Sequence, residues 1–146
     1  MREILTDIVI SAPARKVWHV LTDFAHFPQW NPFILAAEGE VKEGARLRVH
    51  IAPPGARSMM FTPTVIRVVP EREFRWRGRL LLPGLFDGEH IFEIMSSGPN
   101  GIRFVQREEF RGVLVPLLWR RLAMPTRQGF HAMNLALKSQ SEAGEP

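Results

Sequence analysis

The 146-residue chain contains no cysteine and no tyrosine. Without cysteine it can form neither a disulfide nor a thiolate metal site, and a cysteine nucleophile is excluded. Without tyrosine, no phenol of the protein can act as a hydrogen-bond or proton donor. No apolar run approaches the ~20 residues that a membrane-spanning helix requires. A cytoplasmic location is therefore expected.

The patterns that would predict a metal or a cofactor are also missing. The five histidines include no pair at ligand spacing on one helix and no accompanying carboxylate triad, so no metal site is predicted. The chain has no glycine-rich loop of the phosphate-binding type. We therefore expect no bound cofactor.

The chain is basic, with 19 lysines and arginines against 15 acidic residues and a net charge of +4. Such a charge raises the question of a nucleic acid or an anionic membrane as partner. Six arginines alternate with acidic residues on one face of three predicted strands, and the aromatic residues point to the other face: Arg75, Arg77, Arg79, Arg103, Arg107 and Arg111, with Glu89, Glu93 and Glu109 between them. Nucleic-acid binding needs exposed aromatics beside basic residues, so none is expected. A weak membrane-surface contact stays open for three arginines that lie near Trp119 in the sequence: Arg120, Arg121 and Arg127.

The length suits one domain over residues 1–146. A strand over residues 2–10 precedes a helix that begins near Pro13, since proline fits the first helical turn. Asp23 can cap a second short helix, which Pro28 ends. Period-two segments separated by turn signals then predict strands over residues 33–40, 46–52, 60–69, 72–81, 88–95 and 101–112. No helical segment lies between these strands, which favours an antiparallel sheet.

The periodicity becomes helical from about Val113 and continues to about Ser139, with residues 141–146 as a frayed tail. Pro125 falls inside this helix and should kink it, because proline cannot donate to the carbonyl four residues earlier. The sequence thus predicts an antiparallel sheet followed by one long C-terminal helix.

Alternation along the later strands predicts which side chains face the interior. Phe74, Trp76 and Gly78 share the inner face of one strand, and His90, Phe92 and Ile94 share that of the next. In the last strand the inner residues are Phe104, Gln106, Glu108 and Phe110. The sequence therefore places a histidine and a glutamate among inward aromatic side chains.

The turns predict the register of these strands. A hairpin centred on Pro99 sets His90 opposite Glu108 and Phe92 opposite Gln106, and a hairpin centred on Pro83 sets Trp76 opposite His90. Trp76, His90 and Glu108 then form a row across the inner face. A slip of one residue would put His90 and Glu108 on opposite faces.

A buried carboxylate needs a partner, so we expect a hydrogen bond between His90 and Glu108. Two interpretations stay open. The pair is either a structural contact that satisfies two buried polar groups, or an acid/base pair in which His90, oriented by Glu108, exchanges a proton with a bound carbonyl or hydroxyl compound. The sequence identifies neither oxyanion-stabilising donors nor an activated nucleophile.

Two segments resemble a known family: "IVISAPARKVWHVLTDFAHFPQWNPF" near the start, and "FDGEHIFEI" with "GIRFVQREEFRGVLVPLL" near the end. They are similar to polyketide cyclase/dehydrase-type proteins of the START-like (helix-grip, SRPBCC) superfamily. The resemblance implies an α+β fold, in which a curved antiparallel sheet of six to seven strands wraps around a long C-terminal helix, with two short helices after the first strand.

The same resemblance implies an apolar ligand cavity between sheet and helix. Its expected lining is Trp76, Phe92, Phe104, Gln106, Phe110, Leu118 and Phe130, with His90 and Glu108 as candidate catalytic residues. The leading expectation is a carrier or sensor of a small hydrophobic ligand, aromatic, polyketide-like or lipid-like. One alternative is a cyclase, dehydratase or hydratase that uses His90 and Glu108, and another is a chaperone-regulating or protein-interaction module. Both a monomer and a dimer are open.

Overall fold

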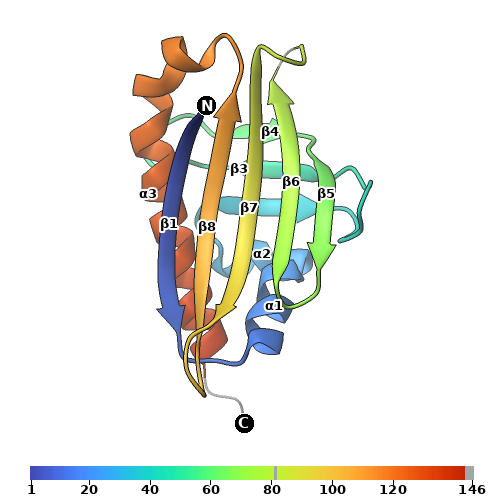
Figure 1. Cartoon of the computed structure of the whole chain (residues 1–146), viewed down its shortest axis with the longest axis vertical. Coiled ribbons are helices and arrows are strands. Elements are labelled where there is room, and N and C mark those ends of the chain that lie inside the picture. The colour runs from blue at the N-terminus through green and yellow to red at the C-terminus, as the bar shows by residue number, and fades with distance from the viewer. Residues whose placement is uncertain (81, 144–146) are drawn as a thin grey trace.

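The fold consists of two antiparallel sheets and a long helix (Figure 1). The structure is a computed structural model that describes residues 1–80 and 82–143. The larger sheet has the order β1-β8-β7-β6-β5 and the smaller sheet the order β2-β3-β4. The strands are β1 (Arg2–Ile10), β2 (Ile34–Glu38), β3 (Arg48–Ile51), β4 (Met59–Phe61), β5 (Thr64–Val69), β6 (Glu73–Leu80), β7 (Phe86–Ser96) and β8 (Ile102–Arg111). All strand pairs are antiparallel, as predicted.

The helices cover the inner face of the larger sheet. Between β1 and β2 lie α1 (Ala14–Thr22), the 3₁₀ turn η1 (Phe24–His26) and α2 (Phe27–Trp30). The long helix α3 (Val115–Glu142) runs beside β1 (Figure 1). The predicted α+β helix-grip fold is confirmed. The expected single sheet of six to seven strands was wrong, because the described strands form one sheet of five and a second sheet of three.

One predicted strand, over residues 60–69, is divided in the structure into β4 and β5. Thr62 and Pro63 lie between them, and proline has no N–H to donate to a strand partner. The two strands belong to different sheets: β4 pairs with β3 in the smaller sheet, and β5 pairs with β6 in the larger one. The chain crosses from one sheet to the other at this proline.

The long helix extends further than predicted, to Glu142 rather than Ser139. Two hydrogen bonds to Glu142 Oε2 hold its last turn: the backbone N–H of Ser11, just after β1, donates at 2.7 Å, and Lys138 Nζ, one turn earlier in α3, donates at 2.6 Å. Ser141 is buried, so a frayed tail beginning at residue 141 was wrong. Residue 81, the predicted end of one strand, and residues 144–146 lie outside the described residues.

The predicted cross-strand register is confirmed at every position named. His90 lies opposite Glu108 and Phe92 opposite Gln106 in the β7–β8 pair. Trp76 lies opposite His90 in the β6–β7 pair. The three strands therefore bring Trp76, His90 and Glu108 into one row.

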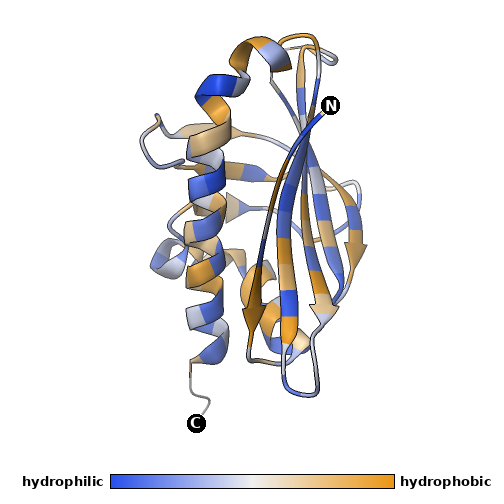
Figure 2. Cartoon of the chain, turned by 60° about the vertical axis from the view of Figure 1, so that its left-hand side comes forward, coloured by the Kyte–Doolittle hydropathy of each residue, from blue (hydrophilic) through white to orange (hydrophobic). Residues whose placement is uncertain are grey.

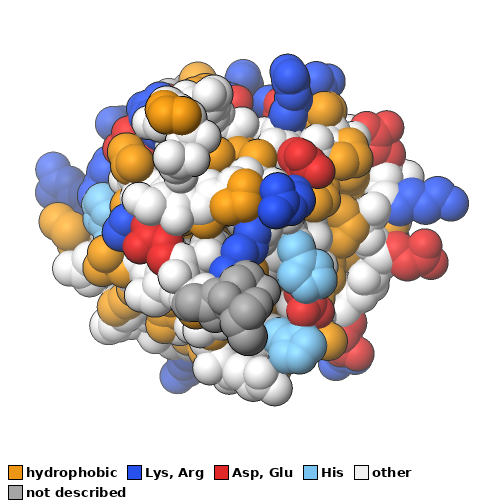
Figure 3. Space-filling model, turned by 90° about the horizontal axis from the view of Figure 1, so that it is seen from below, with side chains coloured by type: hydrophobic (Ala, Val, Ile, Leu, Met, Phe, Trp, Pro, Cys, Tyr) orange, Lys and Arg blue, Asp and Glu red, His pale blue; other side chains and the backbone are white. Residues whose placement is uncertain are grey.

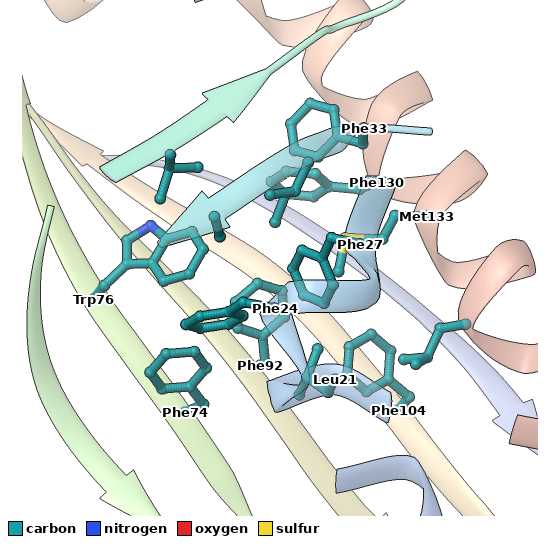
Figure 4. Packing of buried hydrophobic residues seen from close by; sticks show 14 of the residues in the cluster. Leu21, Phe24, Phe27, Phe33, Phe74, Trp76, Phe92, Phe104, Phe130 and Met133 are labelled. Carbon is teal, nitrogen blue, oxygen red and sulfur yellow. The ribbon is translucent and has the colours of Figure 1, made fainter. Parts of the chain in front are cut away.

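Aromatic rings pack between the larger sheet and the short helices, which lie in the lower half of the molecule in Figure 1; Figure 4 shows this packing from close by. Phe74 lies at the centre of this packing: it stacks with Phe24 and Phe92 and makes edge contacts with Trp18 and Trp76. Such pairs contribute about 0.5–1.5 kcal/mol each beyond the burial of their area. The aromatic cluster is what holds α1 and η1 against the sheet.

The outer face of the larger sheet carries ion pairs. Arg75 contacts Glu89 at 2.8 Å, and Arg107 contacts Glu93 at 3.1 Å and Glu109 at 2.8 Å. The pairs Arg75–Glu89 and Arg107–Glu93 are cross-strand contacts, as the alternation predicts, whereas Arg107 and Glu109 are neighbours on β8. Polar and apolar residues alternate along the strands in Figure 2. At the lower end of the molecule, basic, acidic and apolar side chains are mixed (Figure 3). Among the described helices, none combines the length and hydropathy needed to cross a membrane.

Replacing Phe74 by alanine should lower the free energy of unfolding by about 3–5 kcal/mol, because the cavity left behind removes four aromatic contacts. Urea denaturation measures the loss. Val113→Ala is the control: Val113 is 72% exposed, so its truncation should change stability by about 0.5 kcal/mol or less. Equal losses in the two variants would contradict the central place of Phe74 in the core.

Candidate functional site

A cavity of about 100 Å³ lies in the upper half of the interior, bounded by the larger sheet, the smaller sheet and α3. Most of its lining is apolar. The apolar lining residues are Phe33, Ile51, Pro53, Met59, Phe61, Phe86, Phe110 and Leu122. The polar side chains of the lining come from Arg79, His90, Glu108 and Thr126. A mostly apolar cavity with a few polar groups is typical of small-molecule sites.

Two glycines make room for this cavity. Gly78 on β6 lies directly opposite Gly88 on β7, and both line the cavity. A Cβ at Gly78 would lie 3.3 Å from the Phe61 ring, and a Cβ at Gly88 would lie 2.5 Å from Glu108 Oε2. Glycine inside a strand often marks close approach of a ligand or another backbone. Gly78 was predicted on the inner face, but its pairing with Gly88 was not predicted.

His90 and Glu108 face one another across the β7–β8 pair. Their nearest atoms, Nδ1 and Oε1, are 3.7 Å apart, and the side chains are 5% and 19% exposed. This distance is too long for a hydrogen bond, so the direct bond expected from the sequence was wrong. His90 Nε2 is instead hydrogen-bonded to Gln106 Oε1 at 3.0 Å, because the imidazole stacks on Phe92, whose partner on β8 is Gln106.

Behind His90 runs a chain of buried polar groups, which we call the polar chain: Gln106, Asn134 and Thr6. Gln106 Nε2 donates to Asn134 Oδ1 at 2.8 Å, and Asn134 Nδ2 donates to Thr6 Oγ1 at 2.9 Å. The Thr6 hydroxyl donates to the backbone carbonyl of Gln106 at 2.8 Å. The three side chains are at most 2% exposed. Their hydrogen bonds offset the cost of burying amides and a hydroxyl.

Thr6 and Asn134 were not predicted from the sequence. A signal was present in each case. Thr6 occupies an inward position of β1, two residues after the buried Ile4, and Asn134 follows Phe130 by four residues on the inner face of α3. A polar residue at a position whose period predicts an apolar one is a sign of an internal hydrogen bond.

Burial shifts both titratable groups of the pair toward their neutral forms. Desolvation raises the pKa of Glu108 from 4.5 to about 8. Desolvation also lowers the pKa of His90 from 6.5 to about 4, against a smaller opposing effect of the Gln106 hydrogen bond. At neutral pH the cavity therefore presents a carboxylic acid beside a neutral imidazole, that is, a proton donor beside a proton acceptor.

The structure brings only part of the predicted site together. His90, Glu108 and Phe110 line the cavity. Four predicted lining residues instead lie in the packed core, and a fifth belongs to the polar chain: Trp76, Phe92, Phe104 and Phe130, then Gln106 (Figure 4). Leu118 on α3 is partly buried against the core. The short helices fill the lower half of the interior, so the inward aromatics pack there, and the cavity lies above them, where the glycines are.

The smaller sheet supplies a wall of the cavity that the sequence analysis did not predict. Ile51, Pro53, Met59 and Phe61 come from β3, β4 and their connection. Their sequence has the pattern of ordinary strand residues, and their position over the larger sheet depends on how the two sheets pack. Among residues 1–80 and 82–143, no group of three histidine or acidic side chains is arranged to hold a metal ion.

A sequence model of the family described as "Polyketide cyclase / dehydrase and lipid transport" matches residues 1–139. The chain belongs to this family. No curated protein matches it in a sequence search.

Solved structures share its fold at low sequence identity. The Zhui aromatase/cyclase from Streptomyces sp. R1128 superposes with a TM-score of 0.78 and 18% identity, covering 97% of this chain and 93% of that one. A START superfamily protein from Mycobacterium smegmatis gives 0.71 and 20%, with 96% and 97% covered. The di-domain aromatase/cyclase BexL of the BE-7585A biosynthetic pathway gives 0.74 and 16% over 97% of this chain, which spans 48% of BexL. These similarities establish the helix-grip fold.

The shifted pKa of Glu108 predicts how stability depends on pH. The folded protein keeps the Glu108 proton up to about pH 8, whereas the unfolded chain releases it near 4.5, so the unfolding free energy falls as pH rises between these values. His90 acts oppositely, because its pKa is lowered from 6.5 to about 4 and its contribution is complete above pH 6.5.

Between pH 6.5 and 8 we therefore expect Glu108 to lower stability by up to about 1.4 kcal/mol per pH unit. The variant Glu108→Gln should flatten this slope, and the variant Glu40→Gln, at an exposed surface carboxyl, should retain it. Urea denaturation across this pH range measures both. A wild-type slope in Glu108→Gln would show that the carboxyl ionises normally in the folded protein.

Proposed function

We propose that the protein binds a small, largely apolar molecule in the cavity beside His90 and Glu108, as a carrier or sensor. The observation that carries this proposal is an apolar cavity whose inner wall presents one carboxylic acid and one neutral imidazole. Hydrophobic walls supply affinity and a few polar groups supply orientation. The family description, which includes lipid transport, agrees with a binding role.

The size of the cavity favours a compact ligand. Its volume is about 100 Å³, whereas pockets for drug-sized molecules measure roughly 300–1,000 Å³ and a cavity of roughly 150 Å³ takes benzene. Among aromatic, polyketide-like and lipid-like ligands, a molecule of about one ring therefore fits best. A long acyl or polyketide chain would require the smaller sheet or α3 to move outward.

An enzyme of the cyclase, dehydratase or hydratase type is the second candidate. It is favoured by the 3.7 Å separation of His90 Nδ1 and Glu108 Oε1, which places a proton acceptor and a proton donor at the same ligand. General acid–base catalysis needs both groups within hydrogen-bond reach of the substrate. The aromatase/cyclase with the same fold agrees with such chemistry.

Native mass spectrometry of the purified protein, compared with its denatured mass, tests the binding proposal. We expect an excess mass of a small molecule that is released on denaturation and identified after organic extraction. A protein that carries no such mass, and takes none up from an extract of its host, would contradict a carrier.

A variant that fills the cavity tests whether the ligand binds there. Leu122 lines the cavity from α3, so Leu122→Phe should lower ligand occupancy by about tenfold or more, a loss of about 1.4 kcal/mol of binding free energy. The matched change Leu117→Phe adds the same ring at a position of α3 that is 75% exposed, and should leave occupancy unchanged. If Leu122→Phe loses the ligand but still replaces the wild-type protein in the cell, the protein-interaction module is favoured.

The variant His90→Gln separates the carrier from the enzyme. Glutamine keeps a polar group of similar reach but cannot accept and release a proton near neutral pH. Incubation of the extracted compound with fresh protein should give turnover that His90→Gln abolishes if the protein is an enzyme. A carrier should show no turnover, and His90→Gln should change only the dissociation constant.

A further inference from the structure

The hydrogen bonds of the polar chain can be satisfied in only one direction. A backbone carbonyl can only accept, so the Thr6 hydroxyl must give its proton to the carbonyl of Gln106. The oxygen of Thr6 then accepts from Asn134, which must present its amide NH₂ there. Asn134 consequently turns its carbonyl oxygen toward Gln106, and Gln106 must donate to it through Nε2.

This direction decides the tautomer of His90. Gln106 has used its NH₂ on Asn134, so the atom facing His90 is the acceptor Oε1, 3.0 Å from Nε2. An acceptor requires a donor, and Nε2 therefore carries the proton of the neutral imidazole. The other nitrogen, Nδ1, is left with a free lone pair on the side of Glu108, 3.7 Å from Oε1.

We propose that the ligand of this cavity carries a hydroxyl group, as a phenol or an alcohol on an apolar ring, that bridges His90 and Glu108. In this arrangement the ligand hydroxyl donates to His90 Nδ1, and its oxygen accepts from the carboxylic acid of Glu108. The inference deepens the proposed function by naming the ligand class, and it rests on the cavity being the binding site.

The geometry suits one bridging oxygen. Two atoms 3.7 Å apart can both be reached at about 2.8 Å by an oxygen that lies beside the line between them. The raised pKa of Glu108 keeps the acid proton available for this bond at neutral pH. The glycine at position 88 also leaves the neighbourhood of Glu108 Oε2 free of a side chain, since a Cβ there would lie 2.5 Å from that oxygen.

The bridge discriminates between oxygen functions. A carbonyl or an ether only accepts, so it can bond Glu108 but leaves the lone pair of His90 Nδ1 buried without a donor. A hydroxyl both donates and accepts, and it satisfies the two protein groups together. An unmade hydrogen bond at a buried group carries a free-energy cost, which is the physical basis of the selectivity.

Binding of three single-ring probes to the wild-type protein, followed by NMR chemical-shift titration, tests the inference. Toluene reports whether the cavity takes an apolar ring at all, and cyclohexanol and cyclohexanone differ only in their oxygen function. We expect all three to perturb the amide signals of cavity residues, and we expect cyclohexanol to bind about tenfold more tightly than cyclohexanone, the ratio for about one additional net hydrogen bond.

The outcomes separate the two proposals. If toluene binds and the alcohol and ketone bind equally, the hydroxyl bridge is overturned and the binding function stands. If the ketone binds more tightly, the bridge is likewise overturned. If none of the probes binds, both proposals fail, because both require that the cavity accept a single ring.

Thr6 is the position at which the role of the polar chain is tested. Its hydrogen-bond partners, Gln106 and Asn134, do not line the cavity. Thr6→Val keeps the shape but removes the hydroxyl that sets the direction, and Thr6→Ser keeps the hydroxyl. Nitrogen-15 NMR of the His90 ring should show protonated Nε2 and bare Nδ1 in the wild type and in Thr6→Ser, and a mixture of tautomers in Thr6→Val. The preference for cyclohexanol should fall toward parity in Thr6→Val alone.

A wild-type spectrum with the proton on Nδ1 would overturn the inference without use of any variant. A Thr6→Val protein with an unchanged tautomer and unchanged alcohol preference would show that the polar chain does not position His90. A merely structural role of Thr6 would lower the stability of Thr6→Val and leave the ring-nitrogen signals as they are.

Discussion

The pairing of β7 with β8 brings an imidazole and a carboxyl group to the same place inside an apolar interior, and the cost of desolvating them shapes their surroundings. Neither group is charged at neutral pH, since burial moves the pKa values of His90 and Glu108 in opposite directions. His90 is hydrogen-bonded to Gln106, which in turn bonds Asn134 of α3 through its side chain and Thr6 of β1 through its backbone carbonyl. A local pairing of two strands thus determines which polar residues the helix and the first strand must supply.

The interior is divided by the size of its side chains. In the lower half, aromatic residues of β6, β7 and β8 pack against the short helices, and little space is left. In the upper half, Gly78 and Gly88 replace the next inward side chains of β6 and β7, and the cavity lies over them. The same alternation of inward residues therefore produces a rigid core and a binding space, according to whether the inward position carries a ring or a hydrogen atom.

Alternation and turn positions were enough to predict the inner face and the register, because a shift of one residue would have exposed Phe92 and Phe104 to solvent. The same reasoning could not separate core aromatics from cavity lining, since both point inward and only the position of the short helices distinguishes them. Thr6 and Asn134 are 128 residues apart, and no local pattern relates them. The direct bond between His90 and Glu108 was mistaken because the sequence does not reveal that Phe92 fixes the plane of the imidazole.

The place of β1 in the larger sheet has a consequence for how the chain reaches this structure. Of the strands described, β1 is translated first, but its partner in the larger sheet is β8, the one translated last, and the two pair along their whole length from Arg2↔Phe110 to Ile10↔Ile102. Pairings of such high sequence separation form slowly. During synthesis the β1–β8 pairing therefore cannot form until β8 has been translated. The larger sheet therefore gains β1 at its edge only after residues up to Arg111 have been translated.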